Sequence, residues 1–288
     1  MTQRIFAAVL GSLLLSGVAP AADQSFTGRQ AWEIGRKTTC GTLQAGVTRY
    51  GVWQGKAYSR VPGEKDRHLF NLIGVNTRQC ASVDDEARGD GYRSVSREVM
   101  LYLDPQTNEL LDQWENPWTG ERVTVVHVAN DPVNMRAPRF EADARDITLR
   151  SYGDLMVSAS EVPLFYDNPL GGDFQQYVGG TYHAMEIFDT FYPADELLDA
   201  TRRLERSWIA WVRVAQWLPW MEMGSHPGLM VFNATGSSTF DRDSIPEPLR
   251  SILEARYAKY FEPPPLDDDR PNETSWTVFK KTIEATGN

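Results

Sequence analysis

Alternating apolar and polar residues run through most of the chain and predict antiparallel strands. In residues 92–103, Val95, Val99 and Leu101 share one face, while Glu98 and Met100 share the other. Strand-like segments, rich in β-branched and aromatic residues, recur at 47–61, 69–78, 92–103, 110–114, 123–129, 147–151, 155–164, 180–192, 207–217 and 228–237.

The turns between these segments indicate an antiparallel meander. Residues 104–109 (DPQTNE) and 116–121 (NPWTGE) combine Asp, Asn, Pro and Gly, which reverse a chain because they tolerate or preset turn dihedrals. About nine consecutive strands favour a mainly β fold, a meander closing into a calycin- or lipocalin-like barrel with an internal cavity. A two-sheet sandwich is the alternative.

Helical signals are confined to the ends of the chain, which predicts peripheral N- and C-terminal helices. Residues 27–38 form a short candidate helix, and 246–260 have helical periodicity, with Leu249, Leu253 and Tyr257 on one face. A last short helix is expected near 276–285. We therefore expect one β-rich domain over 22–288, with a helical extension over 246–288.

The N-terminus has the pattern of a secretory signal peptide. A positive start is followed by an uncharged apolar run at 5–18 and then by Ala19-Pro20-Ala21. We expect a signal peptide over residues 1–21, cleaved after Ala21 or Ala22. This run is shorter than the roughly 20 residues that span a bilayer, so a periplasmic or secreted protein with no membrane association after cleavage is predicted.

Charge and cysteine content sharpen this prediction. The formal net charge is −10, and no basic stripe is present, which argues against nucleic acid as a partner. Cys40 and Cys80 are the two cysteines. In an oxidising compartment an isolated pair favours a structural disulfide; two buried free thiols are the alternative.

Four strings in the sequence carry a family resemblance. They are YLDP at 102–105, WENPWTGE at 114–121, VHVANDPV at 126–133 and WLPWMEMG at 217–224. With these strings the chain resembles the domain of unknown function 1838 family over roughly residues 30–260. The resemblance implies no accepted activity and no catalytic residues.

Motifs that would dictate a reaction are missing from the sequence. It has no Walker loop, dinucleotide-binding glycine pattern, HExxH, CxxC or G-x-S-x-G. We therefore expect no cofactor. His127 and His183 are the obvious nitrogen ligands if a metal were bound across strands, but hydrogen-bonded histidines without metal are the preferred interpretation.

A candidate site emerges from the hairpin around residues 193–206. A symmetric register places Glu186 opposite Arg213, with Tyr182 on the face of Glu186 and Trp211 and Trp217 on the face of Arg213. Arg213 would hold an anionic or carbonyl group while Glu186 or His183 moves a proton. The alternative is a surface cross-strand salt bridge, and a one-residue slip would separate the pair.

These residues define the expected function. We assign acid–base roles to His127, His183, Glu186 and Glu98, with Arg213, Trp211, Trp217 and Tyr182 contacting a small, partly apolar organic molecule. The first hypothesis is an acid–base enzyme without a redox cofactor: a lyase, isomerase, cyclase or hydrolase. The alternatives are a non-catalytic periplasmic carrier and an envelope structural protein.

Overall fold

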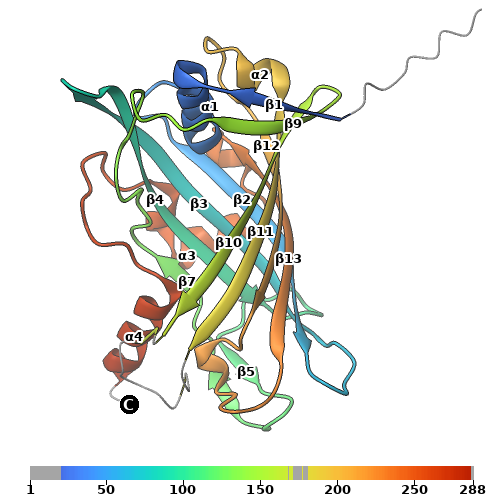
Figure 1. The fold of residues 1–288 in the computed structure, drawn as a ribbon. Helices are drawn as coiled ribbons and strands as arrows, with labels where there is room; N and C mark the ends of the chain where they lie inside the picture. The colour runs from blue at the N-terminus through green and yellow to red at the C-terminus, as the bar shows by residue number, and fades with distance from the viewer. Residues whose placement is uncertain (1–20, 168, 171–176, 178–180, 287–288) are drawn as a thin grey trace, which may run out of the picture.

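The computed structural model describes residues 21–167, 169, 170, 177 and 181–286 (Figure 1). The predicted signal peptide lies outside these residues, apart from Ala21. The strands are β1 (Ala22–Phe26), β2 (Arg49–Arg60), β3 (His68–Asp85), β4 (Gly89–Leu103), β5 (Gln113–Glu115), β6 (Arg122–Thr124), β7 (Val128–Asn130), β8 (Arg139–Phe140), β9 (Ile147–Tyr152), β10 (Leu155–Tyr166), β11 (Tyr182–Pro193), β12 (Ser207–Ala215) and β13 (Leu229–Thr239). The helices are α1 (Gly28–Cys40), α2 (Ala194–Leu198), α3 (Leu249–Arg256) and α4 (Ser275–Thr286), with 3-10 turns η1 (Pro219–Met221), η2 (Arg242–Ser244) and η3 (Ala258–Phe261).

One large, curved antiparallel sheet forms the body of the molecule. Its strands follow the order β1-β9-β10-β11-β12-β13-β2-β3-β4-β7, with β8 also pairing with β4, and β5 and β6 form a separate ribbon. The mainly β, antiparallel fold with helices near the two ends of the chain is therefore confirmed. The connection between β11 and β12, predicted as a polar turn, contains the short helix α2.

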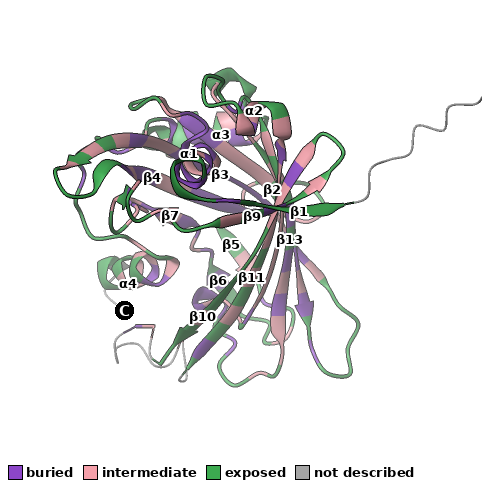
Figure 2. Cartoon of the chain, turned by 45° about the horizontal axis from the view of Figure 1, so that its top comes forward, coloured by how far each residue is buried: buried purple, intermediate pink, exposed green. Residues whose placement is uncertain are grey.

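The predicted closure into a barrel is wrong. In the described part of the chain, β1 pairs only with β9 at one edge, and β7 pairs only with β4 at the other. Closure would need backbone hydrogen bonds between these edges. Helices bridge the arms instead, as Figure 2 shows for α1, which lies inside the curve between β3, β4 and β9.

Two helices fill the concave face at its opposite ends. Near one end, α1 packs Ala31 and Ile34 against Leu149 and Met156 of β9 and β10. Near the other end, Trp276 and Phe279 of α4 join a core with inward-facing residues of the sheet. The alternation seen in the sequence explains why the strands supply apolar side chains to this face, because every second side chain of a strand points inward.

The opposite, convex face is covered by residues 245–261, which include α3 and η3. Val99 and Leu101 of β4 pack there with Leu249 and Leu253 of α3 and with Phe261 of η3. Val99 and Leu101 therefore share one face, as the alternation predicted. The other face of the same strand is the concave one, and it carries Glu98.

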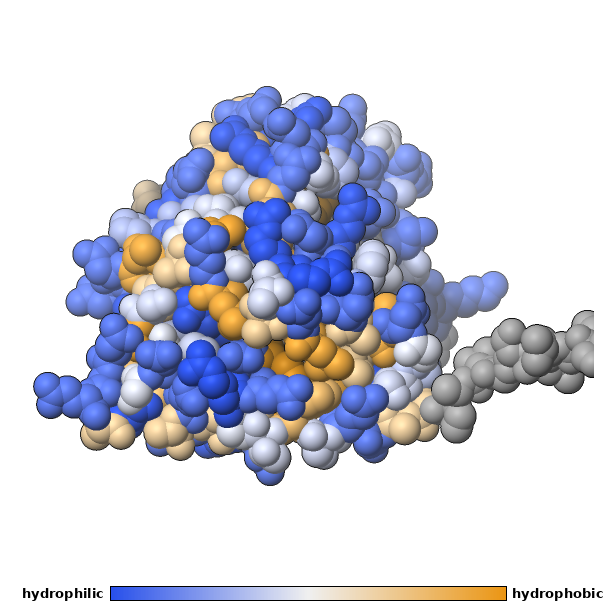
Figure 3. Space-filling model, turned by 90° about the horizontal axis from the view of Figure 1, so that it is seen from above, coloured by the Kyte–Doolittle hydropathy of each residue, from blue (hydrophilic) through white to orange (hydrophobic). Residues whose placement is uncertain are grey.

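The predicted disulfide is present. Cys40, the last residue of α1, is bonded to Cys80 of β3, and both side chains are buried. The bond ties the helix to the sheet. No helix in the described part of the chain is long and apolar enough to cross a membrane. Seen from the end that carries α1 and α2, the surface is mostly hydrophilic, with apolar residues in limited patches (Figure 3).

Candidate functional site

A cavity of about 370 Å³ lies on the concave face, in a size range that holds small organic ligands. Its walls come from β2, β3, β4, β11, β12 and β13, with the last turn of α1 at one end. The lining residues used below are Thr38, Thr39, Arg49, Gly51, Trp53, Asn76, Arg78, Glu98, Glu186, Phe188, Ser207, Trp211, Arg213 and Ser238.

Glu98 and Arg78 are linked through Asn76. The Asn76 amide donates from Nδ2 to Glu98 Oε2 at 3.4 Å, and its Oδ1 accepts from Arg78 Nε at 2.8 Å. Burial raises the pKa of the Glu98 carboxyl above its ordinary value, and the Asn76 bond and the charge of Arg78 offset this only in part. A carboxyl group whose pKa is raised in this way can act as a proton donor or as a proton acceptor.

Glu186 and Arg213 occupy directly opposite positions of β11 and β12, as predicted. Arg213 donates from Nη1 to Glu186 Oε1 at 3.2 Å and from Nη2 to the Tyr182 hydroxyl at 2.7 Å. Burial by itself lowers the pKa of Arg213, but Tyr182 and Glu186 raise it above its ordinary value. The guanidinium therefore stays charged beside the cavity, where it can bind an anion or polarise a carbonyl.

Aromatic side chains form the middle of the cavity. Trp53 of β2 and Trp211 of β12 line it with Phe188, whose ring stacks on Trp211 at a centroid distance of 6.4 Å. Gly74 makes room for Trp53, because a Cβ at Gly74 would overlap the Trp53 indole. The indole Nε1 atoms of Trp53 and Trp211 are buried and have no hydrogen-bond partner among the described residues.

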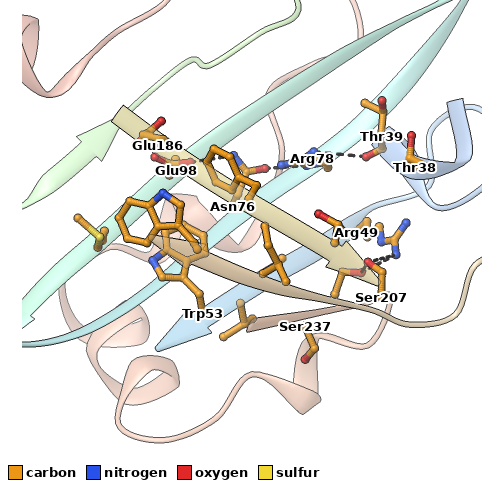
Figure 4. A pocket seen from close by; sticks show the side chains of 18 of the residues that line it. Thr38, Thr39, Arg49, Trp53, Asn76, Arg78, Glu98, Glu186, Ser207 and Ser237 are labelled. Atoms are coloured by element: carbon orange, nitrogen blue, oxygen red, sulfur yellow. Dashed lines mark hydrogen bonds between the residues drawn. The ribbon is translucent and has the colours of Figure 1, made fainter. Parts of the chain in front are cut away.

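The far end of the cavity is cationic and rich in hydroxyls. Figure 4 shows Glu98 and Glu186 at one end, and Arg49 with Thr38, Thr39 and Ser207 at the other. Arg49 donates through Nη2 to Ser207 Oγ at 3.2 Å and also to Ser238 Oγ. Burial and the nearby charge of Arg78 lower the pKa of Arg49 to about 10.

His127 and Trp217 lie in a smaller pocket of about 30 Å³ next to the main cavity. Contrary to the prediction, His127 is not inside a strand but between β6 and β7. Its ring stacks on Tyr102, and Nδ1 accepts the Tyr102 backbone N–H at 3.2 Å. Burial lowers the pKa of His127 to about 4, so the ring is neutral at physiological pH.

His183 is separated from the other candidate residues. It is exposed on the opposite side of β11 from Glu186, where its ring contacts Phe165 of β10. Residues three apart on a strand point to opposite faces, so the pairing that brings Glu186 inward puts His183 outside. His183 and the buried His127 therefore do not meet. Among the described residues, no group of three or more His, Cys, Asp or Glu side chains could hold a metal ion.

Sequence reasoning missed most of the cavity lining. The missed residues that matter most for the chemistry of the cavity are Arg49, Trp53, Asn76 and Arg78. Polar or charged residues inside otherwise apolar strand segments were the available signal. Which of these residues lie opposite each other depends on the register between β2 and β3. That register is shifted by a β-bulge at Ala57/Tyr58, which spacing in the sequence does not show.

Fold and site together describe an open, curved antiparallel sheet around a cavity with aromatic, acidic and arginine side chains. The chain belongs to the family described as "Protein of unknown function (DUF1838)", which matches residues 46–283. No curated protein is significantly similar to the chain.

Among solved structures, the chain is similar to Ail, the attachment invasion locus protein of Yersinia pestis. The likeness covers 68% of this chain and 99% of that chain, with 6% sequence identity. Its TM-score is 0.18, so it carries no argument about fold or function.

Proposed function

We propose that this protein binds a small, partly apolar organic molecule in the cavity of the concave face. The observation that carries the proposal is a set of unpartnered donors in one place. Trp53 Nε1, Trp211 Nε1 and Arg213 Nε are buried and have no hydrogen-bond partner among the described residues. Buried polar groups are normally paired, so three such donors around one cavity indicate acceptor atoms of a bound molecule.

The chemistry around these donors favours an organic molecule over water. Ordered water could satisfy isolated donors. Here the same cavity is lined by Trp53, Phe188 and Trp211, whose rings offer flat apolar contacts to a ring or an unsaturated chain. The open cavity also speaks against the alternative of an envelope structural protein, for which side chains would be expected to fill this space.

Acid–base catalysis on the bound molecule is a second candidate function. It is favoured by the raised pKa of Glu98 in the same cavity as Arg213 and Glu186. Arg213 would polarise a carbonyl or carboxylate while Glu98 or Glu186 transfers a proton. The corresponding reaction is that of a lyase, isomerase, cyclase or hydrolase without a redox cofactor. His127 would act only at the adjacent smaller pocket.

We further propose that the protein works in the periplasm or is secreted, with no nucleic acid and no membrane among its partners. Three observations support this location: the Cys40–Cys80 disulfide, the acidic net charge of −10 and the signal-like pattern of residues 1–21. Disulfides persist mainly in oxidising compartments.

Native mass spectrometry of protein purified from its own host tests the binding function. Excess mass that is lost on denaturation would support it, and that mass would reveal the ligand. Gly51 lines the cavity with open space at its Cβ position, where the nearest atom is the Asn76 carbonyl oxygen at 3.9 Å. A Gly51→Leu variant should therefore fill the cavity and lose the excess mass.

The matched control is Gln54→Leu, because Gln54 lies on the same strand but is exposed. It should keep the excess mass. A bare mass for the wild-type protein, or the same excess mass in Gly51→Leu, would contradict binding in this cavity. For the catalytic alternative, Glu98→Gln should keep the bound mass but abolish conversion of the identified molecule; unchanged conversion would contradict it.

A further inference from the structure

Two arginines face each other directly at the far end of the cavity. Arg49 of β2 and Arg78 of β3 are register partners, and both line the cavity. Directly opposed residues of antiparallel strands have Cβ atoms roughly 4.5–5.5 Å apart, and like charges in this arrangement are destabilising. A cross-strand pair of guanidinium groups therefore needs a source of negative charge.

The protein itself supplies little negative charge at this position. Arg49 donates to the hydroxyls of Ser207 and Ser238 and to the Lys37 carbonyl oxygen. Arg78 donates to Asn76 Oδ1 and to the Thr39 carbonyl oxygen. All of these acceptors are neutral groups. Neither guanidinium forms an ion pair with a carboxylate among the described residues.

The two carbonyls belong to the last turn of α1, where a helix dipole is equivalent to about half a negative charge. That is too little to neutralise two arginines. Arg49 is only 3% exposed, and its Nε has no partner in the described part of the chain. A buried, unpartnered donor on a charged group points to an acceptor that the protein does not contain.

The charges of the whole cavity lead to the same conclusion. Three arginines (Arg49, Arg78 and Arg213) face two glutamates (Glu98 and Glu186) in its lining. The lining is therefore net positive, although the chain as a whole carries −10. A positively charged cavity inside a negatively charged molecule attracts and retains a ligand of negative charge.

From this arrangement we propose that Arg49 and Arg78 form an anion subsite, and that the ligand is an organic anion whose carboxylate binds there. The proposal rests on ligand binding in the cavity, as argued above. The carboxylate would accept hydrogen bonds from the two guanidinium groups; the hydroxyls of Thr38 and Thr39 beside them already donate to the Gly35 carbonyl oxygen. The apolar body would then lie between Trp53 and Trp211, with its far end near Glu98 and Glu186.

Benzoate and its neutral counterpart benzamide test the subsite. Their binding is compared by calorimetry or by thermal shift at constant ionic strength. Wild-type protein should bind benzoate about tenfold more tightly than benzamide, because charge-assisted hydrogen bonds are stronger than neutral ones. Arg78→Gln should abolish this preference, and Gly51→Leu should prevent binding of both compounds.

Lys56→Gln is the matched control, because Lys56 lies on β2 but is exposed outside the cavity. It removes the same charge and should keep the preference for benzoate. Equal affinity of wild-type protein for the two probes, binding of neither probe, or a preference that survives in Arg78→Gln would overturn the anion subsite. Excess native mass that Gly51→Leu removes would still support ligand binding in each of those cases.

Discussion

Glu186 and Arg213 lie directly opposite each other on β11 and β12, and their side chains form an ion pair of 3.2 Å on the concave face. Each side chain is about one-fifth exposed. Arg213 also bonds Tyr182, so one guanidinium links two residues of the neighbouring strand. The pair is therefore part of the cavity wall and is not an isolated surface contact.

Replacing Arg213 with Met should destabilise the protein by about 2 kcal/mol. The substitution leaves the Glu186 carboxylate and the Tyr182 hydroxyl without their partner in a largely buried place. Urea unfolding measures the loss, and adding Glu186→Leu should recover part of it. Arg250→Met, which breaks the exposed pair with Glu247, should have no measurable effect. Equal effects of the two arginine substitutions would show that the cavity pair is only a surface contact.

Glu98→Gln should stabilise the protein increasingly as pH rises. Burial raises the folded-state pKa of Glu98 above its ordinary value of 4.5. Stability contributed by the protonated form is present below that value and is lost as pH rises through the folded-state pKa. The melting temperatures of variant and wild type should therefore be similar near pH 4 and diverge toward pH 8. Glu161→Gln, at an exposed position, should follow the wild type throughout.

His127 should make the protein less stable in acid. Its pKa is about 4 in the folded protein against 6.5 ordinarily, so the unfolded chain binds more protons between these values. Protonation of Nδ1 would also break the bond from the Tyr102 N–H. Wild-type protein should lose roughly 3 kcal/mol from this group between pH 7 and pH 4. His127→Asn keeps an acceptor without titrating and should lose less; exposed His183→Asn should behave as wild type.

Gly74→Ala should cost about 1–3 kcal/mol, the usual effect of overpacking. The new methyl group would overlap the Trp53 indole and the Val99 carbonyl. Gly51→Ala is the matched comparison, because Gly51 is on the neighbouring strand and its Cβ position is open. It should be neutral or slightly stabilising. Chemical denaturation of both variants measures the difference; equal stabilities would mean that Trp53 does not lie against Gly74.

Replacing Cys40 and Cys80 together with Ser should lower the free energy of unfolding by about 3–4 kcal/mol. The disulfide joins residues 40 positions apart and therefore restricts the unfolded chain. Calorimetric unfolding measures the effect. Wild-type protein kept reduced should show the same loss; a reduced protein as stable as the oxidised one would contradict a structural role.

Local patterns predicted much of the fold. Alternation correctly assigned the two faces of β4, and the symmetric hairpin placed Glu186 opposite Arg213. The helix predicted at 27–38 is found as α1, and the last two predicted helices are found as α3 and α4. These features depend on contacts between near neighbours or on the period of a single element.

Long-range geometry could not be predicted in the same way. Alternation shows that one face of a strand is buried, but not whether the first and last strands of a sheet meet, so the barrel was inferred incorrectly. The opposition of Arg49 and Arg78 depends on the bulge at Ala57/Tyr58. An acid–base role was predicted for both His183 and Glu186, although strand geometry puts the two side chains on opposite faces.

The bridging helices have a consequence for how this fold can vary. In a closed barrel, strand number and hydrogen-bond stagger set the interior width. Here the arms of the sheet are joined by side chains, such as Trp276 of α4 against Tyr182 of β11 with ring centroids 4.8 Å apart. Exchanging a few such contact residues would widen or narrow the space between the arms without re-pairing a strand. Relatives could thus accommodate molecules of different size on an unchanged sheet.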